Sequence, residues 1–169
     1  MLLRLAEPDD TMAVARVHVR SWQVGYRTLL PGDFLDRLRP EDRAERYDFA
    51  TRDPGKACTI VALQDGDILG FATVSPARDA DLPDHGELCA FYVDPPWWGR
   101  GVGRALISAA RAHLVEQGFR HAMLWVIAGN VRAERFYRVD RWAPDGFRRA
   151  VARQGLTLDE IRYRRDLAE

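Results

Sequence analysis

Three glycines alternate with other residues in a seven-residue run, Trp98-Gly99-Arg100-Gly101-Val102-Gly103-Arg104, between an apolar strand-like segment and a helix-like one. Glycine lets the backbone approach a ligand closely, and the free amides of a first helical turn carry partial positive charge. Arg100 and Arg104 add full positive charges beside those amides. The run therefore predicts a loop that binds a phosphate group.

Two common phosphate loops do not match this run. A Walker loop ends in Gly-Lys-Ser/Thr, which is missing here. A dinucleotide fingerprint needs glycine at position 104 or 106, where the chain has Arg104 and Leu106. The alternative to an anion site is a glycine turn that merely starts a helix. Three alternating glycines flanked by arginines favour the anion site.

Hydrophobic periodicity places elements around this run, and we expect one domain over residues 1–169. Asp65-Gly66-Asp67 is typical of a hairpin turn, and Asn130 is suited to cap a short helix that runs through Tyr137. We expect strands at 2–6, 57–64, 68–74, 87–93 and 121–127, and helices after Asp9 or Asp10, over 40–49 and over 102–117. Two last strand-like pieces, around Phe147 and over 161–167, flank a polar segment. The fold class is mixed α/β.

The order and spacing of these segments resemble the GNAT superfamily of N-acetyltransferases, which use acetyl-coenzyme A. The resemblance is carried by Tyr92-Val93-Asp94-Pro95, the run 99–104, Leu124-Trp125-Val126, Asn130 and Phe136-Tyr137, and it extends to residues 17–22 and 162–165. It implies the GNAT fold, a twisted and mostly antiparallel sheet flanked by helices. The sheet would be splayed between 87–93 and 121–127, with acetyl-CoA in the split.

The resemblance also assigns cofactor-binding residues. Amides of the run 99–104 would hold the pyrophosphate of coenzyme A. The pantetheine arm would pair with backbone groups of Phe91 and Val93 like a short extra strand, which demands a splayed or bulged strand edge. The Val93 amide would polarise the thioester carbonyl. Asn130 stands where the family often contacts pantetheine or adenosine, and a plain N-cap is the alternative.

Two departures from the family pattern affect local structure. The family often has Gln or Arg three places before the middle glycine, where this chain has Trp98. We expect that indole to stack or pack rather than to hydrogen-bond. A glycine commonly precedes an aromatic residue after the tyrosine, whereas here Arg141 precedes Trp142.

Tyr137 stands where many family members have a tyrosine near the thioester sulfur. A phenol with a pKa of about 10 stays protonated at pH 7 and can donate a proton to the leaving thiolate. The alternative is that Phe136 and Tyr137 form only the apolar face of a short helix. The position in the family pattern favours the acid role.

Glu87 is the candidate base, because an amine must lose a proton before it attacks a thioester. Strand alternation predicts that Glu87 lies on the same side as Cys89, Phe91 and Val93. Several family members carry a glutamate at the matching place, which acts through water. Alternatively, Glu87 is a solvated strand-end residue and the base is a bound water. Other members use a glutamate on the next strand, where this chain has Trp125.

The sequence indicates the residues of the acceptor pocket less clearly than those of the cofactor site. In the family the first helices and the loop before the central strand border the acceptor pocket, so Trp22, Tyr26 and His85 are candidates. Residues 22 and 26 are also spaced to pack on each other along one helix face. The acidic residues Asp79, Asp81 and Asp84 would attract a cationic amine, or they belong to a solvated loop.

Composition excludes several other classes. The chain has 25 basic and 25 acidic residues, and Lys56 is the one lysine. This balance argues against nucleic-acid binding. No apolar run approaches a membrane span, and the N-terminus does not resemble a signal peptide. Cys58 and Cys89 lack metal-ligand spacing and indicate buried residues of a reducing compartment. We expect a cytoplasmic protein that needs no metal. A homodimer is compatible with the sequence.

These observations predict an N-acetyltransferase that moves an acetyl group from acetyl-CoA to a primary amine of a small molecule or peptide. Direct attack in a ternary complex needs no metal and no covalent enzyme intermediate. The rival from another class is an acyl-CoA-binding sensor or assembly module of the same fold that has lost catalysis. A longer acyl group is a third option, and it depends on the pocket volume.

Overall fold

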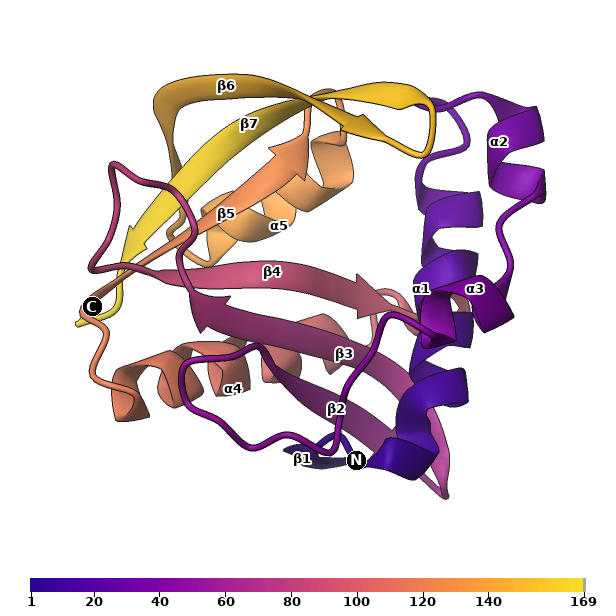
Figure 1. The fold of residues 1–169 in the computed structure, drawn as a ribbon, viewed down its shortest axis with the longest axis horizontal. Coiled ribbons are helices and arrows are strands. Elements are labelled where there is room, and N and C mark those ends of the chain that lie inside the picture. Colours follow the sequence, from indigo (N-terminus) through magenta and orange to yellow (C-terminus); the bar gives the residue numbers. More distant parts are fainter. Residues whose placement is uncertain (169) are drawn as a thin grey trace.

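The computed structural model describes residues 1–168 and contains one sheet with helices on both of its faces (Figure 1). The strands are β1 (Leu2–Leu5), β2 (Cys58–Gln64), β3 (Asp67–Pro76), β4 (Gly86–Val93), β5 (His121–Ile127), β6 (Ala143–Arg153) and β7 (Leu156–Asp166). The α-helices are α1 (Thr11–Gly25), α2 (Gly32–Asp36), α3 (Pro40–Ala44), α4 (Val102–Glu116) and α5 (Val131–Val139). Two 3-10 turns, η1 (Pro8–Asp10) and η2 (Pro95–Trp97), complete the elements. No helix within residues 1–168 is long and apolar enough to cross a bilayer.

The seven strands follow the order β1-β2-β3-β4-β5-β7-β6, and every neighbouring pair except β4–β5 is antiparallel. The parallel pair β4–β5 is joined only where Gly86 opposes Ala122 and Glu87 opposes Met123. Beyond this point the two strands diverge, and Figure 1 shows the gap widening toward α1. The mixed α/β sheet and its split between these two strands, both expected from the sequence, are confirmed.

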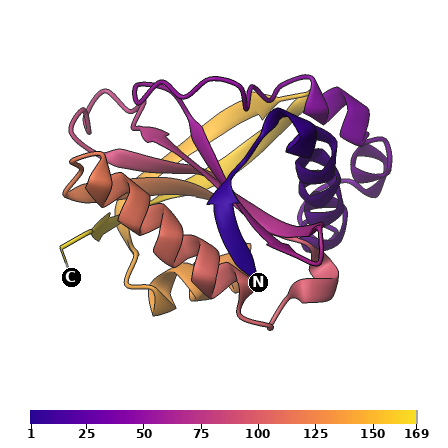
Figure 2. The same cartoon turned by 90° about the horizontal axis from the view of Figure 1, so that it is seen from below.

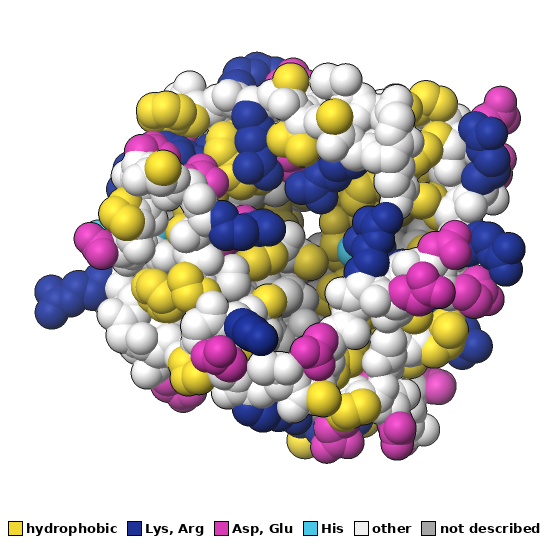
Figure 3. All heavy atoms as spheres, viewed as in Figure 1, with side chains coloured by type: hydrophobic (Ala, Val, Ile, Leu, Met, Phe, Trp, Pro, Cys, Tyr) yellow, Lys and Arg dark blue, Asp and Glu magenta, His cyan; other side chains and the backbone are white. Residues whose placement is uncertain are grey.

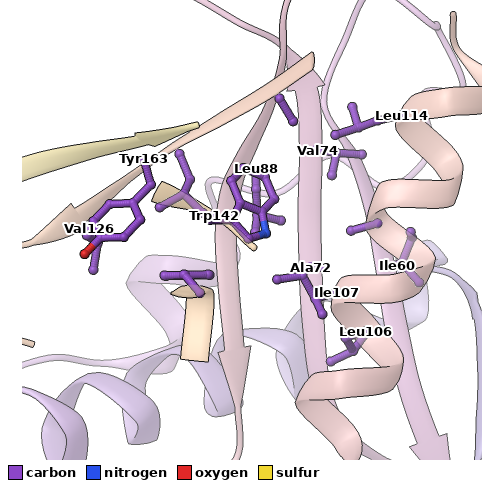
Figure 4. Packing of buried hydrophobic residues seen from close by; sticks show 14 of the residues in the cluster. Ile60, Ala72, Val74, Leu88, Leu106, Ile107, Leu114, Val126, Trp142 and Tyr163 are labelled. Carbon is purple, nitrogen blue, oxygen red and sulfur yellow. The ribbon is translucent and has the colours of Figure 1, made fainter. Parts of the chain in front are cut away.

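Hydrophobic clusters cover both faces of the sheet. On one face, Leu106, Ile107 and Leu114 of α4 pack against strands β2 and β3, as Figure 4 shows. This cluster continues through Leu88 to Trp142, Val126 and Tyr163. On the other face, α1 packs against β2 and β3 through Val14, Val17, Val61 and Phe71. Figure 2 shows α4 and α1 on opposite sides of the sheet.

Several local signals in the sequence are confirmed. Asp65 and Gly66 have φ angles of 53° and 88°, so they form the tight turn between β2 and β3. Helix α5 begins after Asn130, whose side-chain oxygen accepts a hydrogen bond from the Ala133 amide at 3.2 Å. Arg141 takes the left-handed conformation, φ 65°, where the family commonly has glycine. An arginine therefore preserves the turn before Trp142, at a modest conformational cost.

The expected C-terminal pattern was wrong. The polar segment between the two predicted pieces is itself strand, because β6 and β7 form one long hairpin that turns at Gln154 and Gly155. Most of β6 is exposed at the sheet edge, so its polar residues do not interrupt it. The helix expected over 40–49 ends at Ala44, and a second short helix, α2, precedes it.

Candidate functional site

A cleft of about 590 Å³ lies where β4 and β5 diverge. Figure 3 shows the face of Figure 1 hollowed at its centre, with dark-blue basic side chains around the hollow. The cleft has two walls. We call the wall formed by Phe91, Val93, Tyr137 and the loop 99–104 the α5 side. The opposite wall lies on the face of the sheet that α1 covers, and we call it the α1 side. It includes Trp22, Glu87, Trp125, Arg149 and Glu160.

The edge of β4 that borders the cleft carries free main-chain groups. The Asp94 amide donates to the Leu69 carbonyl at 2.8 Å, so every second residue of β4 in this register bonds to β3. The backbone groups of Phe91 and Val93 therefore point away from β3, toward the split. The Val93 carbonyl already accepts bonds from Ser21 Oγ at 3.0 Å and Trp98 Nε1 at 2.7 Å. This leaves the Val93 amide and both backbone groups of Phe91 for a ligand.

A β-bulge changes which residues of β4 share a face. Thr73 opposes Ala90 whereas Val74 opposes Leu88, so Cys89 is an extra residue. Leu88 then lies on the same face as Phe91 and Val93, in the cluster that α4 covers. The expectation that Glu87 shares that face is wrong, because simple alternation fails across the bulge. Glu87 instead faces α1.

The glycine-rich loop combines two left-handed residues with a helix start. Gly99 and Gly101 have φ angles of 72° and 86°, and Gly101 is the N-cap of α4. The amides of the first turn, residues 102–104, lack intrahelical partners, as in any helix. Gly103 lies against Phe136, where an added Cβ would approach the ring to 3.3 Å.

The side chains of this loop have different surroundings. Gly99, Gly101, Gly103 and Arg104 line the cleft. Val102 is buried in the core, and Arg100 lies over the Trp97 ring, 5.3 Å from its centroid. Of the two predicted anion-binding arginines, only Arg104 is thus part of the cleft wall.

A second helix start adds a cation that the sequence did not indicate. Arg132, at the start of α5, stacks on Trp98 at 3.3 Å from the ring centroid, and both line the cleft. The Trp98 indole also donates to the Val93 carbonyl, so the expectation that it would not hydrogen-bond is wrong. Asn130, expected beside the cofactor, lines the cleft and also caps α5.

Tyr137 projects from α5 into the cleft wall. Its ring centroid is 6.2 Å from that of Phe91, beside the free edge of β4. Within residues 1–168 its hydroxyl has no hydrogen-bond partner. Burial, and then the nearby Tyr92, raise the Tyr137 pKa well above its ordinary value. This phenol is therefore protonated at neutral pH.

Two buried carboxylates line the α1 side, and each is paired with an arginine. Glu87 is 3% exposed and accepts a hydrogen bond from Arg78 at 2.9 Å. Glu160 is 6% exposed and pairs with Arg149 at 3.1 Å. The sequence singled out Glu87 alone. Glu160 was missed because it lies far along the chain, in a strand rich in charged residues.

The predicted acceptor residues separate into two groups. Trp22 and Tyr26 line the cleft, and their rings meet edge to face with centroids 5.0 Å apart. His85 is not among the lining residues. It stacks on His121 and contacts Arg164 at 3.0 Å, at the opposite end of β4 from Val93.

One buried arginine holds the acidic loop before β4 in place. Arg162 contacts Asp79, Asp81 and Asp145 at 2.9, 2.8 and 2.7 Å. These carboxylates raise the Arg162 pKa above its ordinary value, and Asp81 contributes most. Asp79 also accepts a bond from the Trp125 indole at 3.3 Å. The two aspartates therefore fasten the loop over Trp125, and both already have a cationic partner in Arg162.

The chemistry available in this cleft combines free strand-edge amides, a helix start beside arginines and a protonated phenol. No group of three or more His, Cys, Asp or Glu side chains suited to a metal ion occurs in the described part of the chain. The arrangement suits a ligand with both amide and phosphate groups.

Comparison with known proteins agrees with this geometry. The chain is 29% identical over 161 residues to YuaI, an uncharacterized N-acetyltransferase of Bacillus subtilis strain 168, with 94% of this chain and 89% of the relative covered. It is also 29% identical over 122 residues to aminoglycoside N(6')-acetyltransferase type 1 of Stenotrophomonas maltophilia, with 70% of each covered. The structure of yncA from Salmonella typhimurium with its cofactor acetyl-CoA has the same fold, with a TM-score of 0.73 and 18% identity over 100% of this chain and 95% of that one.

The segment that contains the split sheet, the glycine-rich loop and Tyr137 is also the segment that matches a family model. Residues 19–140 match the model of the acetyltransferase (GNAT) family. The site and the match therefore agree that the chain belongs to the GNAT family and is an acyltransferase of that type.

Proposed function

We propose that this GNAT acetyltransferase moves the acetyl group of acetyl-CoA to a primary amine of a small molecule or peptide, by direct attack in a ternary complex. Acetyl-CoA supplies an acetyl group already activated as a thioester. The protein's task is to hold both substrates together and to manage two protons.

The free edge of β4 beside Tyr137 carries this proposal. The Val93 amide and the backbone groups of Phe91 face the split and have no strand partner there. A pantetheine arm, which contains two amide groups, would complete this edge. The Val93 amide would then polarise the acetyl carbonyl. In the same cleft, the loop 99–104 offers the first-turn amides of α4 to a pyrophosphate, with Arg104 beside them.

Tyr137 would act as the acid. Because burial raises its pKa, the hydroxyl keeps its proton until a sulfur anion develops beside it. The free hydroxyl would donate to that sulfur. Cofactor binding would depend little on this bond, because most contacts with the cofactor are made by the main chain.

Glu87 would act as the base through a bound water. Its carboxylate is held by Arg78, whose side chain is 71% exposed. A buried carboxylate with an exposed cation beside it can relay a proton toward solvent through water. If the amine arrives already neutral, bound water alone suffices, so the Glu87 role needs its own test.

Two measurements on one protein sample test the proposal. Acetyl-CoA at about 100 times its Kd should raise the Tm by roughly 5 to 10 °C. Thiol release from acetyl-CoA should then appear with at least one member of a panel of amines, amino acids, aminoglycosides and peptides. A Tm increase without thiol release would favour the binding module that lacks catalysis. The absence of both would contradict acetyl-CoA as the ligand.

A further inference from the structure

Among the side chains that line the α1 side of the cleft, arginines outnumber carboxylates: Arg78, Arg149 and Arg153 against Glu87 and Glu160. Strand β7 presents Leu158, Glu160 and Arg162 to the α1 face, since the alternate residues Ile161 and Tyr163 belong to the cluster that α4 covers. Arg149 pairs with Glu160 across the β6–β7 ladder and lies 4.1 Å from the Trp125 ring centroid. Arg153, four residues further along β6, shares this face and lines the cleft.

Three other arginines near this wall have no carboxylate partner among the described residues. Arg78 and Arg149 are matched by Glu87 and Glu160. Within residues 1–168, Arg43, Arg46 and Arg153 form no ion pair. Arg43 and Arg46 come from α3 and the residues just after it, and Arg153 comes from the tip of the β6–β7 hairpin, so two segments distant in sequence supply them.

Arg153 lines the cleft, whereas Arg43 and Arg46 do not, although their charges act on the same histidine. The charges of Arg43, Arg153 and Arg46, after burial, lower the pKa of His18 well below its ordinary value. The His18 ring stacks on Tyr92, with centroids 4.5 Å apart, and Tyr92 lines the cleft. Burial, and then Arg46 and Arg153, also lower the Arg43 pKa, although Tyr47 and Tyr92 oppose this effect. The positive charges of these arginines therefore repel one another near the end of β4 that lies closest to α1.

A buried donor lies in the same wall. The Trp22 indole lines the cleft, yet its Nε1–H is buried and has no partner among the described residues. An indole can only donate a hydrogen bond, so a ligand that satisfies it must offer an acceptor atom. Unpaired cations and an unpaired donor thus call for the same kind of ligand group.

We infer that the acceptor amine carries an oxyanion, either a carboxylate or a phosphate-type group, which binds at Arg153 and the Trp22 donor, attracted also by the charges of Arg43 and Arg46, while the amine faces the acetyl group. This inference rests on the proposed acetyl transfer and specifies its substrate class. An oxyanion would relieve the repulsion among the arginines and form charge-assisted hydrogen bonds with guanidinium groups. An aminoglycoside, which carries several ammonium groups, would meet repulsion there.

The experiment compares matched acceptors by thiol release from acetyl-CoA. Each amino acid is paired with its carboxamide, and each aminoalkylphosphonate with its neutral diester. Rates are referred to the concentration of free amine, because the acidic group also changes the ammonium pKa. We expect kcat/KM to be about tenfold or more higher for the acidic members. The carboxylate and phosphonate arms show which oxyanion the site prefers.

Variants connect this preference to the arginines. Arg153→Gln and Arg43→Gln should lower the ratio of acidic to neutral kcat/KM by about tenfold. Arg148→Gln is the matched control, since Arg148 neighbours Arg149 but pairs with Asp159 on the other face of β6. Arg148→Gln should keep the ratio of the unmodified protein.

The outcomes separate this inference from the proposed function. Turnover of amines without preference for the acidic member, or a preference that both arginine variants retain, overturns the inference and leaves the acetyl transfer intact. If no amine in the panel turns over, N-acetylalanine and N-acetylalaninamide are titrated into the protein saturated with coenzyme A. Tighter binding of the acid that Arg153→Gln abolishes supports the inference, and equal binding or none overturns it.

Discussion

The two walls of the cleft are built by different means. The α5 side offers main-chain groups, from Phe91, Val93 and the start of α4, over an apolar core. The α1 side offers charged side chains on strands, and most of its carboxylates are matched by arginines. Recognition by main-chain groups leaves the side chains free to pack, so the same wall can be kept for one fixed ligand. A wall of paired and unpaired charges suits an acceptor that is chosen by its own charge.

The walls also differ in what holds them in place. Tyr137 and the helix starts are fixed by apolar packing against β4 and β5. The loop over Trp125 is fixed by Arg162 and its aspartates. Changes in either wall should therefore affect different properties, and the following four variants test this.

Arg162→Met should have the largest effect, on stability. Removing a buried guanidinium leaves Asp79 and Asp145 without their cation, which should lower the free energy of unfolding by about 3 to 5 kcal/mol. Arg148→Met is the control, because its pair with Asp159 is exposed on both sides and should contribute less than about 1 kcal/mol. Urea unfolding measures both. Equal losses would show that charge does not hold this wall.

The same pair of proteins gives a pH prediction. Arg162 lowers the pKa of Asp81, so this carboxylate stabilises the fold above its unfolded pKa of about 3.9 and loses that effect as pH falls through the lower folded value. The stability difference between the unmodified protein and Arg162→Met should narrow below about pH 4. A difference that stays constant down to pH 2 would contradict the pairing.

Tyr137→Phe should lower kcat about 100-fold, because a general acid contributes roughly that much. The Kd for acetyl-CoA should change little, since the ring remains and the main chain would make most of the cofactor contacts. Stopped-flow thiol release and calorimetry separate the two quantities. A large loss of affinity with unchanged kcat would assign Tyr137 to cofactor binding instead.

Glu87→Gln should lower kcat/KM for the acceptor about 30-fold at pH 7, as expected for a lost general base. The gap should close as pH approaches about 10, where the amine is largely neutral without help. The full pH–rate profile is the measurement. A profile with the same shape as that of the unmodified protein would leave bound water as the base.

Gly101→Ala should have the smallest effect on function, a rise of about tenfold in the Kd for acetyl-CoA. Gly66→Ala is a close control, because both glycines have positive φ and open space around the added Cβ, but Gly66 lies in the β2–β3 turn. Both variants should lose about 1 kcal/mol of stability. Equal Kd values would remove the loop conformation from cofactor binding.

The sequence predicted the α5 side better than the α1 side for a physical reason. Glycine spacing, the N-cap at Asn130 and strand periodicity are local signals, and the α5 side is built from short runs of residues that carry them. The split between β4 and β5 also followed, because it depends on the order of these segments.

The α1 side depends on contacts that spacing does not encode. Arg162 meets Asp79 and Asp81, more than eighty residues away, and Glu160 meets Arg149 through the register of a hairpin that was not foreseen. The face predicted for Glu87 was wrong because one bulged residue, Cys89, reverses the alternation of side chains along β4. His85 was placed by loop position, yet it lies outside the cleft lining.

Amide hydrogen exchange at Phe91 and Val93, followed by NMR with and without acetyl-CoA, tests the central claim most directly. Both amides face the split, whereas the Tyr92 amide between them bonds to β3. The account predicts that acetyl-CoA slows exchange at Val93 and Phe91 far more than at Tyr92. Saturating acetyl-CoA that leaves the Val93 amide exchanging at its original rate would contradict it.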